Sequence, residues 1–140
     1  MPMNDPSPLA LLSGLPLFAA YFAASVALLA ACVAIYVRIT PYPEFQLIRD
    51  GNSAAAASVA GALLGFAMPL ASAVVHSVTL PDMLLWSAVA LAVQLAVYAV
   101  AHRLLPHLPA AVAQGQVASG VFLGALSAAV GLINAACLSY

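Results

Sequence analysis

Long apolar runs dominate this chain, and short stretches containing polar residues, Pro or Gly separate them. A helix needs about 20 residues to cross the hydrocarbon core of a bilayer. Four runs reach that length, at residues 16–37, 53–78, 82–105 and 110–138. Pro and Gly favour turns over continued helix in the separating stretches. The pattern predicts an all-α protein, an integral membrane four-helix bundle.

The second and fourth apolar runs resemble each other. GNSAAAASVAGALLGFAMPL begins at Gly51, and the weaker match GQVASGVFLGALSAAVGLIN begins at Gly115. Each copy would hold two crossings, so both copies must point the same way. We therefore expect two parallel two-helix repeats. The predicted parts are an N-terminal outer-face segment at 1–15, a first transmembrane hairpin at 16–79 with a cytoplasmic loop at 38–52, and a second hairpin at 80–140 with a cytoplasmic loop at 102–109.

Composition and charge agree with a bilayer as the surrounding solvent. The chain is 66% hydrophobic and 5% charged, with a net charge of -1, which excludes a nucleic-acid partner on electrostatic grounds. The three cationic side chains, Arg38, Arg49 and Arg103, all fall in the first and third loops. The positive-inside rule places those loops in the cytoplasm and both termini outside, unless another signal sets the topology. The N-terminal segment has Asp5 and no Lys or Arg, so we expect no cleaved secretory signal.

Small residues recur every four positions in the second and fourth runs. They allow helix backbones to approach closely, which is the main source of helix association in lipid. These two helices should form the packing spine, either within one protomer or as a dimer interface. The residues are Ser53, Ala57, Gly61 and Gly65 in the second run and Gly120 and Gly124 in the fourth. Pro69 should bend the second helix, which shapes its packing or marks a gate.

Polar side chains inside the apolar runs are the candidate intramembrane sites. Gln94 lies near the middle of the third run, Asn52 near the inner end of the second and Asn134 toward the outer end of the fourth. The three amides should mark three depths and not form one cluster. Ser72 and His76 give the second helix a polar outer end, close enough to Asp82 for a hydrogen-bonded group. Such residues act either as hydrogen-bonding contacts between helices or as a conducting or binding site.

The first loop is the most polar stretch. EFQLIRD predicts a short surface helix on which Phe45, Leu47 and Ile48 face the membrane interface. The polar residues of this segment, Glu44, Arg49 and Asp50, form a candidate partner loop that would bind a cytoplasmic protein. The alternative is a solvated loop that only fixes topology.

No pattern of catalytic, metal-binding or cofactor-binding residues is present. Cys32 is expected near the inner face of the membrane and Cys137 near the outer face, too far apart for a disulfide, and neither has a Cys or His at metal-ligand spacing. The chain has no phosphate-binding Gly loop and no nucleophile elbow. We therefore expect neither an enzyme nor a cofactor.

The segments PEFQLIRDGNSAAAASVAGALLGFAMPLASAVVHSV, LPDMLLWSAVALAVQLAVY and GLINAACLSY resemble the bacterial inner-membrane family called domain of unknown function 350, the YjfL-like proteins. The matching residues are Glu44, Gly51, Asn52, Gly61, Gly65, Pro69, Asp82, Trp86, Gln94, Asn134 and Ala135. The resemblance implies four crossings, a duplicated two-helix unit and a role in envelope homeostasis. Gln116 departs from the pattern, since the first copy has Asn52 there.

Two functions remain open from the sequence. The first is a subunit of a homo-oligomeric channel or transporter, in which Gln94, Asn52 and Asn134 would be pore or gate residues. Four crossings leave little room for a central pathway, so that pore would lie between protomers. The alternative is a non-conducting membrane scaffold or adaptor that recruits a cytoplasmic partner.

Overall fold

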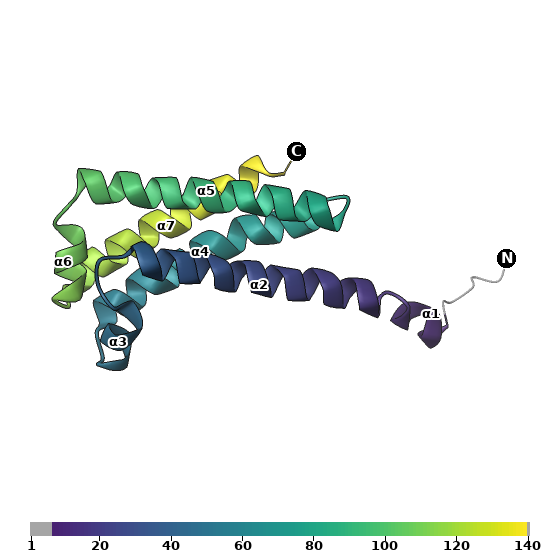
Figure 1. Ribbon diagram of the computed structural model, residues 1–140, viewed down its shortest axis with the longest axis horizontal. Coiled ribbons are helices and arrows are strands. Elements are labelled where there is room, and N and C mark those ends of the chain that lie inside the picture. The colour runs from purple at the N-terminus through teal and green to yellow at the C-terminus, as the bar shows by residue number, and fades with distance from the viewer. Residues whose placement is uncertain (1–6, 140) are drawn as a thin grey trace.

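The computed structural model describes residues 7–139, which form four long helices and three short ones (Figure 1). The long helices are α2 (Leu15–Ile39), α4 (Ser53–His76), α5 (Leu80–Leu104) and α7 (Val117–Cys137), and the short ones are α1 (Pro8–Leu12), α3 (Glu44–Arg49) and α6 (Leu108–Ala113). Four spans are long and apolar enough to cross a membrane, the first of them comprising α1 and α2. This confirms the all-α membrane architecture. Residues 1–6 of the expected N-terminal segment lie outside the described residues.

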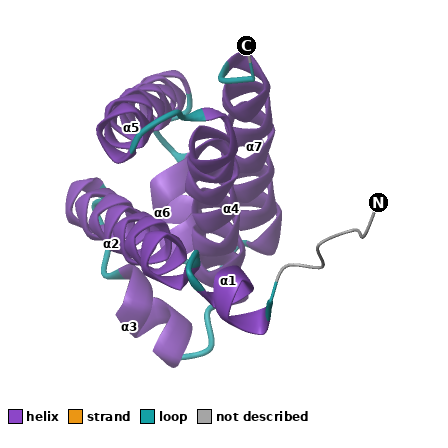
Figure 2. Cartoon of the chain, turned by 90° about the vertical axis from the view of Figure 1, so that its right-hand side faces the viewer, coloured by secondary structure: helices purple, strands orange, loops and turns teal. Residues whose placement is uncertain are grey.

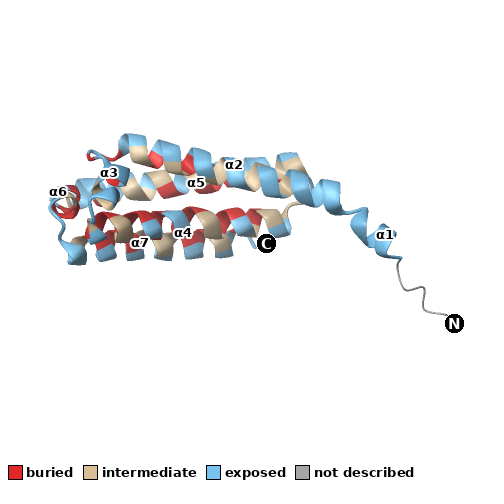
Figure 3. Cartoon of the chain, turned by 90° about the horizontal axis from the view of Figure 1, so that it is seen from below, coloured by how far each residue is buried: buried red, intermediate tan, exposed pale blue. Residues whose placement is uncertain are grey.

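The long helices form two layers, with α2 and α5 on one side and α4 and α7 on the other (Figures 2 and 3). Most buried residues face the boundary between the layers or the contact between α4 and α7 (Figure 3). α2 projects past the bundle at its N-terminal end, where Leu17 and Phe18 are 65% and 64% exposed. In a bilayer these side chains would contact lipid.

α4 and α7 run in the same direction with their backbones in contact. Gly120 lies against Ala54, Gly124 against Ala57 and Gly61, and Gly131 against Gly65. A Cβ atom added at Gly61 or Gly120 would clash with the backbone of the opposite helix. The recurring small residues therefore set the distance between these two helices.

Pro69 lies inside α4 and is fully buried. It has no N–H group, so the carbonyl oxygen of Gly65, four residues earlier, loses its helical donor. Gly131 packs directly over that oxygen, and a Cβ atom there would overlap it. The neighbouring helix thus covers the backbone group that proline leaves free.

Equivalent turns precede α4 and α7. Gly51 and Gly115 have φ values of 87° and 83°, in the left-handed region that glycine adopts without strain. The N–H of Asn52 donates to the carbonyl of Leu47 at 2.8 Å, and the N–H of Gln116 donates to that of Ala111 at 3.0 Å. The single helix expected at 110–138 is therefore wrong, because the turn at Gly115 divides that run into α6 and α7.

The three arginines gather at one end of the bundle. Arg38, Arg49 and Arg103 occupy the last turns of α2, α3 and α5, and all three side chains are exposed. We call this the α3/α6 end (Figure 1). The basic side chains lie near helix C-termini, where the helix dipole favours positive charge.

Candidate functional site

Each of the three amides binds a carbonyl on another helix. Asn52 Nδ2 donates to Val112 and Ala113 at 3.0 and 3.3 Å, while its Oδ1 accepts the N–H of Ala55 and caps α4. Gln94 Nε2 donates to Ser127 at 2.7 Å. Asn134 Nδ2 donates to the Ala90 carbonyl at 3.2 Å. The amides lie at separate depths, and each joins helices at its own level.

A line of buried polar atoms without partners runs along the inward face of α5. Ser87 Oγ, Gln94 Oε1 and Tyr98 Oη are buried and make no hydrogen bond to the residues described. Spacings of seven and four residues put these side chains on one helix face. They cover roughly 16 Å of the helix axis at 1.5 Å per residue. We call these three residues the α5 polar line.

Glu44, from α3, lies near the Tyr98 end of that line. Its side chain is 0% exposed, and neither carboxylate oxygen has a hydrogen-bond partner within the described chain. The partner-loop hypothesis needs a surface position, whereas Glu44 faces the bundle. It shares the inward face of α3 with Leu47 and Ile48, which lie three and four residues later. Arg49 and Asp50 are exposed, as a partner-binding surface would require.

Three tyrosines lie near Glu44 and Ser58 lies against two of them, and we call the five residues the Glu44 cluster. Tyr36 comes from α2, Tyr42 from the following loop, Ser58 from α4 and Tyr98 from α5. The Tyr36 hydroxyl lies 3.4 Å from Ser58 Oγ, and the Tyr36 and Tyr98 ring centroids are 5.3 Å apart. All three tyrosines lie close enough to Glu44 to interact electrostatically with its carboxylate.

Two members of the cluster, Glu44 and Tyr42, lie outside the membrane-spanning helices, and burial raises the pKa of both. Loss of hydration raises the pKa of Glu44 to about 7, and the nearby Tyr36 hydroxyl offsets part of that rise. Burial, followed by the Glu44 charge, raises the pKa of Tyr42 to about 12. The carboxyl group can therefore exchange its proton near neutral pH, while Tyr42 stays neutral.

The opposite end of the bundle holds a separate polar group. Ser72 Oγ donates to the Ala135 carbonyl at 2.8 Å and lies 3.4 Å from Ser139 Oγ. His76 Nδ1 lies 2.8 Å from the Ser72 carbonyl oxygen. Asp82 does not bond with these residues; its carboxylate accepts the Val78 N–H at 3.1 Å. The expected hydrogen-bonded group thus forms between Ser72 and His76 without Asp82 in the described residues, because Asp82 stabilises the turn before α5.

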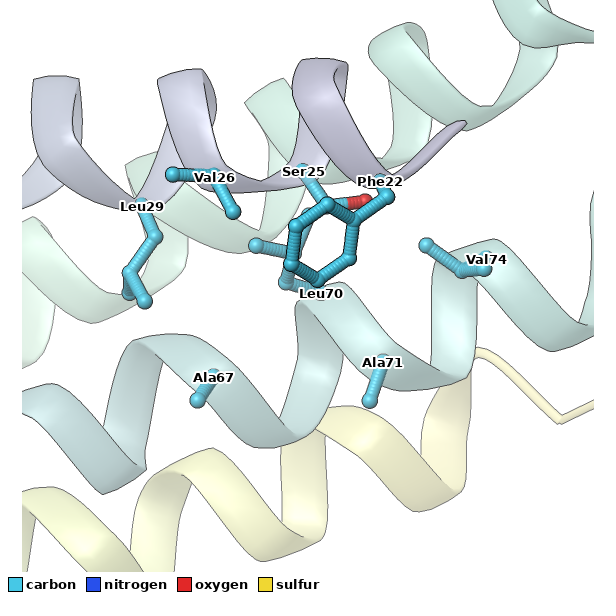
Figure 4. Close-up of a pocket in the computed structure, with 8 residues that line it drawn as sticks. All are labelled: Phe22, Ser25, Val26, Leu29, Ala67, Leu70, Ala71 and Val74. Carbon is cyan, nitrogen blue, oxygen red and sulfur yellow. The ribbon is translucent and has the colours of Figure 1, made fainter. Parts of the chain in front are cut away.

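Two surface grooves accompany these polar groups. One lies between α2 and α4, has a volume of about 190 Å³ and is lined mainly by apolar side chains, with Phe22, Leu70 and Val74 among them (Figure 4). The other lies at the α3/α6 end, has a volume of about 270 Å³ and is lined by Pro41, Tyr42, His102, Pro106, Pro109, Ala110 and Ala113. Tyr42 belongs both to this second groove and to the Glu44 cluster.

Within residues 7–139 no three His, Cys, Asp or Glu side chains meet in a way that could hold a metal ion. Cys32 and Cys137 are both free thiols. Sequence reasoning did not find the inward position of Glu44 or the tyrosines around it. The available signal was the spacing of Glu44 with Leu47 and Ile48, which puts the carboxylate on the apolar face of α3.

Comparisons with known proteins agree with this architecture. Residues 10–138 match the family described as Domain of Unknown Function (DUF350). The chain is also similar to "UPF0719 inner membrane protein YjfL" from Escherichia coli strain K12 and from Escherichia coli O157:H7, with 38% identity over 130 residues in each case. Those alignments cover 93% of this chain and 98% of each relative.

No solved structure matches the chain. The relatives' name, together with four apolar spans, supports a multi-pass location in the inner membrane. The match over nearly the whole length shows that the chain belongs to the DUF350 family.

Proposed function

We propose that this protein is a subunit of a channel or transporter for small ions in the bacterial inner membrane, with its path along the α5 polar line. The supporting observation is the run of buried polar atoms without partners at Ser87, Gln94 and Tyr98. Most buried polar atoms in proteins have hydrogen-bond partners, and an unmade bond costs about 1 to 3 kcal/mol. A bundle held together only by packing would gain nothing from three such groups on one face.

The orientation in this proposal follows the arginines. The positive-inside rule puts the α3/α6 end, with Arg38, Arg49 and Arg103, in the cytoplasm and both termini outside. The path would then begin near Glu44 on the cytoplasmic side and continue past Tyr98 and Gln94 toward Ser87.

Two parallel repeats also belong to this proposal. Supporting them are the parallel course of α4 and α7 and the equivalent turns at Gly51 and Gly115. The contact between α4 and α7 leaves no space for a wide central pore, so any wider passage would lie between protomers of a homo-oligomer. The α5 polar line would itself suit only a small charge carrier.

Flux through liposomes tests the path. Ser87→Ala should lower ion flux without lowering thermal stability, because the buried Ser87 hydroxyl makes no hydrogen bond in the described structure. Ser25→Ala is the matched control, since Ser25 Oγ donates to the Tyr21 carbonyl at 2.7 Å and lies beside the apolar groove. Wild-type flux equal to that of empty liposomes would contradict the proposal, as would Ser87→Ala flux equal to wild type.

The scaffold remains a second candidate because of the outer face of α3. Phe45 is 54% exposed there, next to the exposed side chains of Arg49 and Asp50. An aromatic group among charges is a common anchor for a protein partner. Capture of a cytoplasmic protein that is lost on Arg49→Ala, with no measurable flux, would favour this function over the channel.

A further inference from the structure

Glu44 occupies a position where packing does not require a carboxylate. Leu108 precedes Gly115 by as many residues as Glu44 precedes Gly51, so the two residues hold matching places before the two turns. Leu108 is buried, with 7% of its surface exposed, whereas Glu44 is 0% exposed. An apolar side chain therefore fills this place before α7. The carboxylate before α4 needs another explanation, because an unpaired buried acid is costly.

The polar groups near Glu44 come from several elements. They are the hydroxyls of Tyr36, Tyr42 and Tyr98; Ser58 Oγ lies 3.4 Å from the Tyr36 hydroxyl, and His102 stacks on Tyr98 with ring centroids 6.2 Å apart. No arginine donates a hydrogen bond to the carboxylate in the described structure. Each hydroxyl can donate to an ionised carboxylate or accept from a protonated one. The surroundings can thus accommodate both protonation states with small reorientations.

We infer that Glu44 is a reversible proton-binding site at the cytoplasmic entrance of the α5 polar line. In the binding step, one carboxylate oxygen forms an O–H bond with a proton from hydronium, and a water molecule is released. The carboxyl group becomes neutral and can donate to a neighbouring hydroxyl. The position of this site at an entrance rests on the proposed function, but the proton binding itself does not.

A proton suits this site better than a metal ion. Calcium takes six to eight oxygen ligands, usually including several carboxylates, and magnesium requires near-octahedral coordination. Here one carboxylate lies among neutral hydroxyls. In the described part of the chain, no three His, Cys, Asp or Glu side chains are placed so that they could hold a metal ion. The loss of hydration also favours the protonated form, since it raises the pKa of Glu44 to about 7.

The groove at the α3/α6 end offers a route for the proton. Tyr42 and His102 both line this groove, and Tyr42 also neighbours Glu44. The groove has a volume of about 270 Å³, enough for several water molecules. Water in the groove could therefore deliver a proton to the carboxylate through a movement of the Tyr42 side chain.

The chain allows a direct test because Glu44 is the only glutamate in its 140 residues. We would label glutamate with ¹³C at the side-chain carboxyl, reconstitute the full chain in nanodiscs and follow its NMR signal with pH. Glu44→Gln identifies the signal by removing it. The expected midpoint lies near 7, as the structure indicates for Glu44. A midpoint near that of free glutamate would overturn the inference, because the carboxylate would then be hydrated.

Two further measurements test whether the bound ion is a proton and whether Tyr36 interacts with the Glu44 carboxylate. Replacing choline with sodium in the buffer should leave the midpoint unchanged; a sodium-dependent midpoint would make an alkali cation the ligand and overturn the proton assignment. Tyr36→Phe should raise the midpoint, because the Tyr36 hydroxyl stabilises the carboxylate charge. Tyr21→Phe is the matched control and should leave it unchanged. An unchanged midpoint in Tyr36→Phe would contradict the proposed arrangement of the cluster.

These outcomes are separate from the outcome of the flux experiment. A midpoint near 7 without measurable flux would retain the proton site and reject the channel or transporter. Flux that depends on Ser87, together with an ordinary glutamate midpoint, would retain the path and reject Glu44 as its proton-binding group.

Discussion

The turn before α4 and the turn before α7 share a backbone and differ in their side chains. Both turns use a glycine with positive φ, and both close with corresponding backbone hydrogen bonds. Before α4, Asn52 caps the helix and reaches the carbonyls of Val112 and Ala113. Before α7, Gln116 makes no side-chain cap. The same local path therefore tolerates different polar contacts.

The comparison extends to the helices around the turns. α2 meets α4 beside an apolar groove, whereas α5 meets α7 through the amides of Gln94 and Asn134. Glu44 is likewise matched by Leu108. Glycine and small residues thus determine the backbone arrangement in both halves, while the buried polarity is distributed unequally. Substitutions that exchange features between the halves can separate architecture from function.

The largest effect should come from the contact that the two halves share. Gly61→Val would drive a side chain into the backbone of Gly124 and cost about 3 kcal/mol or more of stability. Thermal unfolding in detergent and size-exclusion chromatography would measure the loss. Gly14→Val is the control, because the nearest atom to a Cβ there is the Leu11 carbonyl oxygen at 3.9 Å. Equal behaviour of the two variants would show that the α4 and α7 backbones are not in contact.

Glu44→Leu would make the first turn resemble the second at a buried position. The pKa of Glu44 is about 7 in the folded protein and lower in the unfolded chain, so the native state holds more protons between these values. Wild-type stability should therefore fall as pH rises from about 4.5 to about 7 and level off above, with a total loss of about 2 kcal/mol after allowance for solvent screening near the bundle end. The variant should lack this loss and be more stable than wild type at pH values above 7.

Denaturant unfolding of both proteins at several pH values measures that difference. Asp50→Asn removes an exposed carboxylate one residue beyond α3 and should retain the wild-type pH dependence. Parallel pH curves for wild type and Glu44→Leu would contradict the prediction.

Much of the fold follows from local sequence signals. The apolar runs predict four spans because hydrocarbon requires about 20 apolar residues per helix. The run of small residues around Gly61 predicts close helix packing, and EFQLIRD predicts the short helix α3. These signals act over a few residues and do not depend on distant contacts.

The remaining features depend on three-dimensional context. The residues that follow Gly115 include no nearby proline, so only its alignment with Gly51 indicates the positive φ that divides α6 from α7. The carboxylate of Glu44 favours a surface position by its chemistry, but the face of α3 that packs on the bundle determines its burial. The tyrosines around it come from three separate segments, which only the fold brings together.

The cap at Asn52 distinguishes the two turns most directly. Asn52→Ala removes the bond to the Ala55 N–H and the bonds to Val112 and Ala113, and should cost about 1.5 kcal/mol. Gln116→Ala removes no side-chain cap and should change stability by less than about 0.5 kcal/mol. Thermal unfolding of both variants under one condition gives the comparison. Similar losses at the two positions would mean that Asn52 does not join the halves.

The smallest effect should come from the amide on α5, where stability and flux are expected to diverge. Gln94→Leu removes the bond to the Ser127 carbonyl, a contact between membrane helices worth about 1 kcal/mol. It also removes the unpaired Oε1 atom, whose burial is unfavourable, so the net loss of stability should be smaller still. Asn134→Leu serves as the control, because it breaks a similar bond, to the Ala90 carbonyl, and Asn134 itself belongs to α7 and is not one of the three residues of the α5 polar line. If Gln94 lies on an ion path, only Gln94→Leu should abolish flux. Equal loss of flux in both variants would mean that Gln94, like Asn134, acts only as a contact between helices.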